Sequence, residues 1–193
     1  MTNYSTEKLR SLIDESGGLA SPNRFSVVLP DVSQMVSPAL QLTAERLGAI
    51  DPRDLNVICT SAQLPGKQLN VMSREVGIGT KSIANGQVFT AINLSFYLTN
   101  RYEIRKYFQH WMNCVVTQDE NDAMYAGYYN NYVRDVTIHQ LSRENDSIES
   151  SIYSVTLVNA FPTQMELISL NNQAQTTAME MTISLAYKTY KII

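Results

Sequence analysis

The sequence contains few of the residues that most often carry chemistry. Its 193 residues include two cysteines, two histidines and one tryptophan. Two cysteines, Cys59 and Cys114, are too few for a disulfide framework. The amino-terminal segment also has no apolar stretch typical of a secretory signal. We therefore expect this chain to be assembled in a reducing cytoplasm.

An excess of positive charge and long hydrophobic runs are also missing. The chain has 15 basic and 18 acidic side chains, which gives a net charge of −3. Tight nucleic-acid binding normally depends on a basic surface that displaces counterions from phosphates, so we do not expect it here. No run of eighteen apolar residues is present, and the sequence therefore predicts no membrane insertion.

The motifs typical of nucleotide binding are incomplete. Gly77-Ile78-Gly79 begins like a dinucleotide-binding fingerprint, but Ser82 takes the place of the third glycine and no helical pattern follows. A flexible hairpin is the better interpretation of this glycine-rich segment. No nucleophile elbow or paired-histidine zinc helix is present. The sequence thus predicts no enzyme and no cofactor.

One pair of residues has the spacing of metal ligands. His110 and Cys114 are four residues apart, so on a helix they share one face and could hold a zinc ion together. A structural zinc site needs four ligands, and only His139 and Cys59 remain to complete it. A buried cysteine is also common as a small hydrophobic residue. We predict no metal site, and a metalloprotein built on this pair is kept as an alternative.

Alternation of apolar and polar residues is the strongest pattern in the chain. With 44% hydrophobic residues, the chain can bury one sizeable core. Period-two alternation is typical of antiparallel strands that have one face in a core and one face in water. The predicted strands are Phe25–Leu29, Val57–Ala62, Phe89–Leu98, Arg134–Leu141, Ser151–Val158 and Ala178–Tyr190, with a break at Pro162.

Two segments have a helical period. The first begins after Ser5 and ends at Gly17-Gly18. The second, central helix is predicted to begin with Asn100 as its N-cap, with Glu103 reaching back to it. Its apolar stripe predicts a helix that packs on a sheet through the core residues Ile104, Phe108 and Trp111, together with Tyr107 and Val115.

Two longer segments interrupt this pattern. The polar stretch Leu69–Gln87, with Gly77, Gly79 and Gly86, predicts a long protruding hairpin. Pro30–Asp54 combines three prolines with a short helical patch at Leu40–Leu47, and it predicts a surface loop or insertion. The expected fold is mainly β, with two antiparallel sheets in a sandwich or barrel, one packed α-helix and one long hairpin. Residues 1–20 are expected to form an arm and 21–193 a single β domain with an insertion at about 30–54.

The outward faces of several predicted strands carry small, neutral polar groups. An ordinary solvated sheet would show the same pattern. A smooth wall along which a polyanion can slide would also show it, because a basic wall would hold the polyanion in place. The candidates for such a wall are Asn93, Ser95, Asp135, Thr137, Ser154, Thr156, Thr182 and Ser184.

The order of these features resembles a known family. Pro22-Asn23-Arg24-Phe25 leads into the first strand, Ala62-Gln63-Leu64-Pro65-Gly66 forms a turn before the extended loop, and a strand ends at Tyr97-Leu98-Thr99-Asn100 before the helix. The most specific part is the block Leu157–Thr163 (Leu-Val-Asn-Ala-Phe-Pro-Thr) followed by an alternating final strand. Over roughly residues 20 to 190, the chain resembles the tail tube proteins of contractile-tail bacteriophages.

This resemblance implies a structural virion protein of the tail. It implies hexameric rings that stack into a hollow tube inside a sheath, with the phage DNA passing through the lumen. The expected partners are further copies of the chain, the tail sheath protein, and the baseplate and tube-terminator proteins. It also implies that the extended loop reaches a neighbouring subunit, with Arg74, Glu75, Gly77, Gly79 and Lys81 as the candidate contact residues.

Some features leave other functions open. The segment Pro30–Asp54 is longer than the short connection of the family, so a baseplate tube-initiator protein of the same fold is an alternative. The secreted tubes of bacterial injection machines are also similar in architecture and are a third possibility. A non-enzymatic β-sandwich binding module is a further alternative, because Tyr125, Tyr128, Tyr129 and Tyr132 are close together in the sequence.

Overall fold

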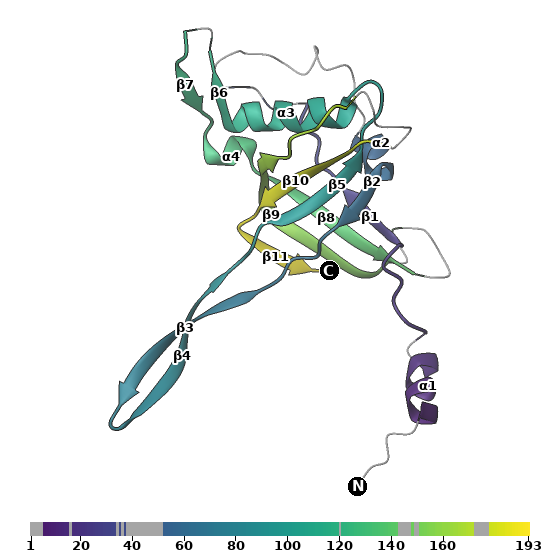
Figure 1. Ribbon diagram of the computed structural model, residues 1–193, viewed down its shortest axis with the longest axis vertical. Coiled ribbons are helices and arrows are strands. Elements are labelled where there is room, and N and C mark those ends of the chain that lie inside the picture. The colour runs from purple at the N-terminus through teal and green to yellow at the C-terminus, as the bar shows by residue number, and fades with distance from the viewer. Residues whose placement is uncertain are drawn as a thin grey trace.

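The computed structural model describes residues 6–15, 17–33, 35, 37, 52–119, 121–142, 148, 151–171 and 178–193. Its fold is mainly β, with antiparallel sheets and one long packed helix, which confirms the predicted fold class. Figure 1 shows a compact body from which a two-stranded hairpin and a short helix project. The helices are α1 (Thr6–Glu15), α2 (Pro52–Val57), α3 (Glu103–Val115) and α4 (Tyr129–Tyr132). The strands are β1 (Phe25–Val28), β2 (Cys59–Ala62), β3 (Gln68–Val76), β4 (Gly79–Val88), β5 (Ile92–Tyr97), β6 (Val116–Gln118), β7 (Met124–Ala126), β8 (Arg134–Leu141), β9 (Ser151–Met165), β10 (Glu180–Ala186) and β11 (Thr189–Ile192).

One long strand, β9, connects two halves of the main sheet. Among the described residues the strand order is β1-β8-β9-β10-β5-β2, and β11 pairs with β9 as well. The first part of β9 pairs with β8 and β11, whereas residues 161–165 pair with β10. We call β1, β8, β11 and the first part of β9 the β8 sheet. The β5 sheet comprises β2, β5, β10 and residues 161–165 of β9.

The predicted break at Pro162 is wrong, because this proline lies inside β9. Its partner in the register is Leu185, and the register between β9 and β10 shifts at that point. A strand tolerates proline at a bulge or an edge because a ladder hydrogen bond is already missing there. The Thr163 hydroxyl donates a 3.2 Å hydrogen bond to the Ser184 carbonyl at the same place. The strand therefore continues through the proline and passes from one sheet to the other.

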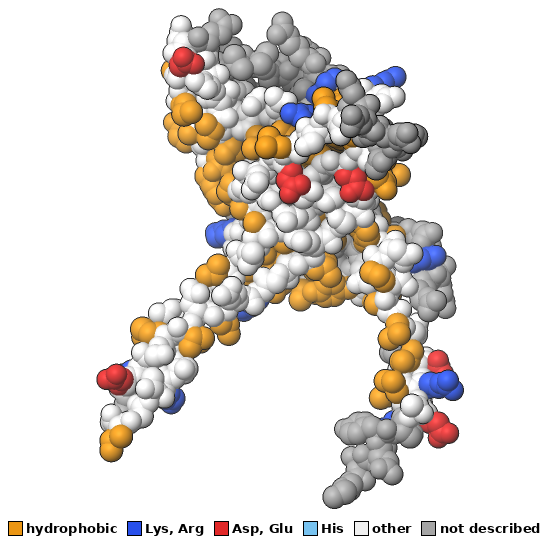
Figure 2. Space-filling view, in the orientation of Figure 1, with side chains coloured by type: hydrophobic (Ala, Val, Ile, Leu, Met, Phe, Trp, Pro, Cys, Tyr) orange, Lys and Arg blue, Asp and Glu red, His pale blue; other side chains and the backbone are white. Residues whose placement is uncertain are grey.

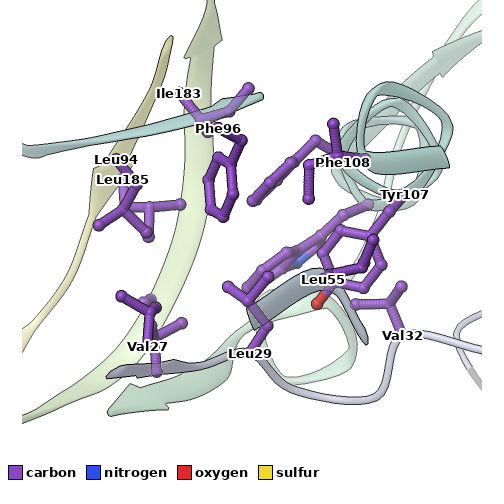
Figure 3. Packing of buried hydrophobic residues seen from close by; sticks show 14 of the residues in the cluster. Val27, Leu29, Val32, Leu55, Leu94, Phe96, Tyr107, Phe108, Ile183 and Leu185 are labelled. Carbon is purple, nitrogen blue, oxygen red and sulfur yellow. The ribbon is translucent and has the colours of Figure 1, made fainter. Parts of the chain in front are cut away.

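The apolar faces of both sheets point into one core. Leu94 and Phe96 of β5 and Leu185 of β10 belong to the same buried cluster as Val27 of β1. Figure 3 shows Leu94 and Leu185 on one side and Val27 on the other, with their side chains directed toward one another. Because the inward positions alternate with outward ones, the polar residues of the two sheets must point away from this core in different directions.

Helix α3 closes one end of the core with aromatic side chains. Ile104, Phe108 and Trp111 are completely buried, as the apolar stripe predicts. The centroid of the Phe108 ring lies 5.5 Å from that of the Phe96 ring (Figure 3). The Phe108 ring is also stacked on that of Trp111, with 6.2 Å between the ring centroids. The predicted Val115 is only half-buried, and His110 and Cys114 are buried in addition. The helix thus buries a wider face than the stripe indicates.

The predicted N-cap of α3 is wrong. The helix begins at Glu103, and its N-cap is Tyr102, which has left-handed backbone angles (φ 55°) and makes no side-chain cap hydrogen bond. The Tyr102 amide donates a 2.9 Å hydrogen bond to the Thr99 carbonyl. This bond closes a turn from residue 99 to 102, so Asn100 lies within the turn and cannot cap the helix.

The segment predicted as a surface loop, Pro30–Asp54, contributes to the core where the structure describes it. Val32, Met35 and Ser37 are each at most 5% exposed. The Tyr107 hydroxyl donates a 2.6 Å hydrogen bond to the Pro30 carbonyl, which fixes the start of the segment against α3. These residues are buried rather than exposed at the surface, and the surface-loop prediction is wrong for them. The predicted helical patch at residues 40–47 lies outside the described residues.

Three strand boundaries also differ from the prediction. Val57 ends helix α2, and the strand predicted from it begins only at Cys59. The strand predicted from Phe89 begins at Ile92. The strand predicted from Ala178 to Tyr190 is two strands, β10 and β11, which pair with different parts of β9. Only in this last segment does the hydrogen-bonding partner change along a continuous alternation of apolar and polar residues.

Candidate functional site

The polar face of the β5 sheet contains four of the predicted wall residues. Ser95 lies opposite Thr182 and Asn93 lies opposite Ser184 in the register of β5 and β10. The Ser95 and Thr182 hydroxyls are 3.2 Å apart, and the Ser184 hydroxyl donates a 2.7 Å hydrogen bond to Asn93 Oδ1. These four side chains therefore satisfy one another and form a neutral strip, and the exposed Glu180 lies at the end of this strip on the same face.

The other four candidates lie on the β8 sheet. The hydroxyls of Thr137 and Thr156 are 2.9 Å apart across β8 and β9. Asp135 Oδ1 accepts a 2.9 Å hydrogen bond from the backbone N–H of Asn159. Ser154 is buried, and its hydroxyl lies 2.7 Å from His139 Nδ1. This face thus combines hydroxyls with titratable groups, whereas the four candidates on β5 and β10 are all neutral.

The structure divides the eight candidates between two surfaces that face away from a common core. Alternation along a strand identifies its outward residues, but it does not identify which strands belong to the same sheet. The pairing of β5 with β10, and of β8 with β9, supplies this information. In Figure 1, β10, β5 and β2 lie in front of β8 and β1.

The β5 sheet has two strand edges without a partner among the described residues. At one edge β2 pairs only with β5, and at the other edge residues 161–165 of β9 pair only with β10. Unpaired strand edges expose amide and carbonyl groups that readily pair with another chain. No lysine or arginine occurs in β2, β5, β10 or residues 161–165. Among the described residues, the β5 sheet therefore has no lysine or arginine and has an unpaired strand at each of its two edges.

The hairpin of β3 and β4 carries the five predicted contact residues at its far end. Arg74, Glu75, Gly77, Gly79 and Lys81 are all exposed. The two-residue turn between the strands begins with Gly77 at φ 65°, an angle that glycine adopts without strain. The next residue, Ile78, is fully exposed. Figure 1 shows the hairpin projecting from the end of the body opposite α3, which confirms the predicted protruding hairpin.

A tryptophan anchor that the sequence alone did not reveal positions the loop after α3. Trp111 Nε1 donates a 2.7 Å hydrogen bond to the Tyr132 carbonyl. Earlier in the same loop, the Gly127 backbone amide donates a 2.8 Å hydrogen bond to the Val115 carbonyl at the end of α3. A Cβ atom at Gly127 would lie 2.3 Å from the Cys114 carbonyl oxygen, so only glycine fits there. The tyrosine-rich segment is therefore packed on α3 at this point.

The potential metal ligands and thiols lie in apolar surroundings. His110 Nε2 lies 3.8 Å from the Cys114 sulfur, as their spacing on the helix predicts. Among the described residues, no group of three or more His, Cys, Asp or Glu side chains comes together in a geometry that could hold a metal ion. Burial raises the pKa of the Cys59 thiol to about 12 and that of Cys114 to about 11. Both thiols are therefore poor nucleophiles at neutral pH.

Comparison with known proteins identifies the family of this fold. The family model described as phage tail tube protein matches residues 20–193. This chain belongs to the phage tail tube protein family. Members of this family are structural components of the phage tail rather than enzymes, which confirms the prediction of a non-enzymatic virion protein. No curated protein sequence matches the chain.

Several solved structures share the fold. A chain of the sheath-tube complex of an extracellular contractile injection system (PVC, extended state) is 16% identical, with 99% of each chain covered and a TM-score of 0.58. A chain of the tube-terminating cap of the anti-feeding prophage is 16% identical, with 91% of each chain covered and a TM-score of 0.60. A chain of the PVC sheath/tube terminator is 13% identical over 91% of this chain and 96% of that chain, with a TM-score of 0.56.

Within the described residues, no helix is both long and apolar enough to cross a membrane.

Proposed function

We propose that this chain forms the inner tail tube of a contractile tail, as hexameric rings that stack around a lumen through which phage DNA is delivered. The observation that carries the proposal is the β5 sheet, which combines two edges unpaired among the described residues with a polar face free of lysine and arginine, in a member of the tail tube family. When β2 of one copy lies beside residues 161–165 of the next, both edges are paired. Repetition around a ring closes one continuous barrel without free edges.

The polar, cation-free face of the β5 sheet then lines the lumen. DNA carries one negative charge per phosphate, and a wall with lysine or arginine would hold it by releasing counterions. The β5 sheet has none of these residues, and the paired hydroxyls and amide of Ser95, Thr182, Asn93 and Ser184 satisfy each other. The β8 sheet, with Asp135, Thr137, Ser154 and Thr156, then faces outward from the lumen. This assignment gives DNA a surface along which it can slide.

The partners follow from the position of such a tube. The outer surface of the rings contacts the tail sheath protein, and the two ends of the tube contact the baseplate and terminator proteins. The similarity to chains of a sheath-tube complex and of a sheath/tube terminator supports these partners. The protein is assembled in the host cytoplasm and remains in the virion tail. Residues 21–193 form one β domain with an insertion at about 30–54, and residues 1–20 form an arm.

A second candidate is a protein that caps or initiates the tube. The TM-score to the tube-terminating cap, 0.60, is similar to the score of 0.58 to the sheath-tube complex. A capping or initiating protein would form a single ring or a short stack of rings, because one face of the ring binds a different protein.

Electron microscopy of the purified protein tests both candidates. A tube protein polymerises into hollow tubes of many rings at high concentration, and averaged end views show sixfold symmetry. Rings that never extend would favour the cap or initiator. A protein that stays monomeric at all concentrations and ionic strengths would refute both, and it would favour the β-sandwich binding module.

A further inference from the structure

Strand β9 contains one residue with a backbone conformation that strands do not use. Asn159 has φ 54°, in the left-handed region, although it lies inside the strand. Asparagine reaches this region more easily than most residues, but only glycine enters it without a steric cost. No other residue in the described strands has a positive φ. Such a conformation persists only where surrounding contacts hold it.

The ladder between β8 and β9 has one extra residue at this point. The register shifts between Arg134 and Val136, so that Asp135 of β8 faces two residues of β9, Val158 and Asn159. This is the arrangement of a β-bulge, which leaves one strand amide without its ladder partner. The backbone N–H of Asn159 instead donates its 2.9 Å hydrogen bond to Asp135 Oδ1. The carboxylate thus replaces the missing ladder acceptor.

The bulge reverses which residues of β9 face the core. Before it, the odd-numbered Val155 and Leu157 are completely buried. After it, the even-numbered Ala160 and Pro162 are buried. A regular strand would keep one parity along its length, so the extra residue moves the side chains that follow it to the opposite face.

The residues placed in this way form one of the two unpaired edges of the β5 sheet. The Phe161 ring contacts Tyr132 of α4, with 5.4 Å between the ring centroids. After the register shift between β9 and β10, Gln164 lies opposite Ser184 on the polar face. Figure 2 shows the surface over β5 and β10 as mostly uncharged, with two acidic side chains just below α3. If the bulge were lost, residues 161–165 would slip by one position, and their side chains would exchange faces.

We propose that Asp135 is a positioning residue for ring closure. Its carboxylate holds the bulge at Asn159 and thereby sets the register of residues 161–165, the edge that pairs with β2 of the next copy. This inference rests on the proposed ring. An edge strand pairs correctly with another chain only when its own register is fixed. Without the Asp135–Asn159 contact, part of the monomers presents this edge one residue out of register, and these monomers cannot close the ring.

Substitutions at the two residues test this contact. Asp135→Ala removes the acceptor, and the monomer should fold but require about a tenfold higher concentration for half-assembly, because a hydrogen bond to a charged group is worth roughly that factor. Asp135→Asn keeps an acceptor oxygen and should assemble like the wild type. The double variant Asp135→Ala/Asn159→Gly should also recover, because glycine adopts left-handed angles without the carboxylate.

Thr137→Ala is the matched control. Thr137 lies on the same outward face of β8, and its hydroxyl is 2.9 Å from that of Thr156 in the regular part of the ladder. This variant loses a contact between the same two strands but leaves the bulge intact. It should therefore assemble like the wild type.

Two measurements follow these variants. Sedimentation gives the concentration at which half of the protein is assembled. Hydrogen exchange of residues 155–165, followed by mass spectrometry in the monomer, reports the bulge itself and should be about tenfold faster in Asp135→Ala, for the same reason. Circular dichroism melting curves check that each variant folds.

Assembly of Asp135→Ala at the wild-type concentration would refute the inference. A defect that Asn159→Gly does not correct would also refute it, because the carboxylate would then act otherwise than through the bulge. If Asp135→Ala does not fold, the double variant decides: its folding and assembly support the inference, and its failure overturns it. If the wild type forms neither rings nor tubes, the proposed function fails. Unchanged exchange of residues 155–165 in the Asp135→Ala monomer, by contrast, refutes the role of the contact independently of assembly.

Discussion

The hydroxyl of Ser184 on β10 donates a 2.7 Å hydrogen bond to Asn93 Oδ1 on β5. Both side chains project from the outward face of the β5 sheet, and each would otherwise bind water. Together with the neighbouring contact of Ser95 and Thr182, the bond makes a strip of neutral side chains that are already paired with each other. Such a strip suits the wall of a channel, and it leads to a direct test of which sheet lines the lumen.

The lumen assignment predicts a difference in the accessibility of introduced thiols. Ser95→Cys lies on the β5 sheet and Thr137→Cys on the β8 sheet. A maleimide attached to a bulky polymer cannot enter the lumen of an assembled tube. It should therefore modify the cysteine of the Thr137→Cys variant, on the outer surface, and not that of the Ser95→Cys variant. In the monomer both variants should react.

The native thiols give a low background in this experiment. Burial raises the pKa of Cys59 to about 12 and that of Cys114 to about 11, so few thiolates are present at neutral pH. Mass spectrometry of the labelled protein gives the extent of modification. Rapid labelling of Ser95→Cys in intact tubes, with Thr137→Cys protected, would reverse the assignment of the two sheets.

Trp111→Ala should destabilise the monomer strongly. The side chain is completely buried, stacks on Phe108 and donates a hydrogen bond to the Tyr132 carbonyl. Removal of a large core aromatic costs about 3 to 5 kcal/mol in the free energy of unfolding. Urea unfolding at a protein concentration below that of assembly measures this cost. Gln109→Ala, an exposed position on the same helix, is the control and should change the stability little.

Gly127→Ala should destabilise the packing of the tyrosine-rich segment on α3. The added Cβ would lie 2.3 Å from the Cys114 carbonyl oxygen, and backbone cannot move aside as easily as a side chain. We expect a loss of about 1 to 3 kcal/mol, which is typical of overpacking in a filled site. Gly66→Ala, where nothing lies within 4 Å of the added atom, is the matched control. Equal melting temperatures of the two variants would contradict this contact.

Stability should decrease in mildly acidic solution because of His139. Partial burial holds the pKa of this imidazole below its ordinary value of 6.5. Below pH 6.5 the unfolded chain therefore binds more protons than the folded chain, and the free energy of unfolding falls until the folded-state pKa is passed. Urea unfolding at a series of pH values should show this decrease in the wild type and a smaller one in His139→Gln. Parallel curves for the two proteins would exclude a contribution of His139.

Deletion of residues 1–20 should leave the β domain folded. Helix α1 has no buried residue, and the family model begins at residue 20. The thermal midpoint of the shortened monomer should therefore be close to that of the full chain. A large decrease in the midpoint would show that the arm is part of the domain and would contradict the proposed division.

Local features of the chain are predictable because they depend on neighbouring residues. The alternation in β5, β8 and β10 identifies their inward and outward positions. The spacing of Ile104, Phe108 and Trp111 identifies the buried face of α3, and the glycines near residue 77 identify the hairpin. The predictions failed where a distant contact overrides the local preference. Pro162 remains in a strand because the register of β9 shifts there. Val32 and Met35 are buried in a segment that is hydrogen-bonded to α3 through Pro30 and Ser37.

The sequence by itself determined that this chain is a mainly β, cation-poor protein with one packed helix and one long hairpin. Only the tertiary structure decided how its polar residues are distributed in space. Ser95 and Thr137 have the same alternation, but they point away from a common core on different sheets. Likewise, only the register places Asp135 opposite both Val158 and Asn159. Strand pairing joins residues far apart in the chain, and periodicity within a strand contains no information about the partner.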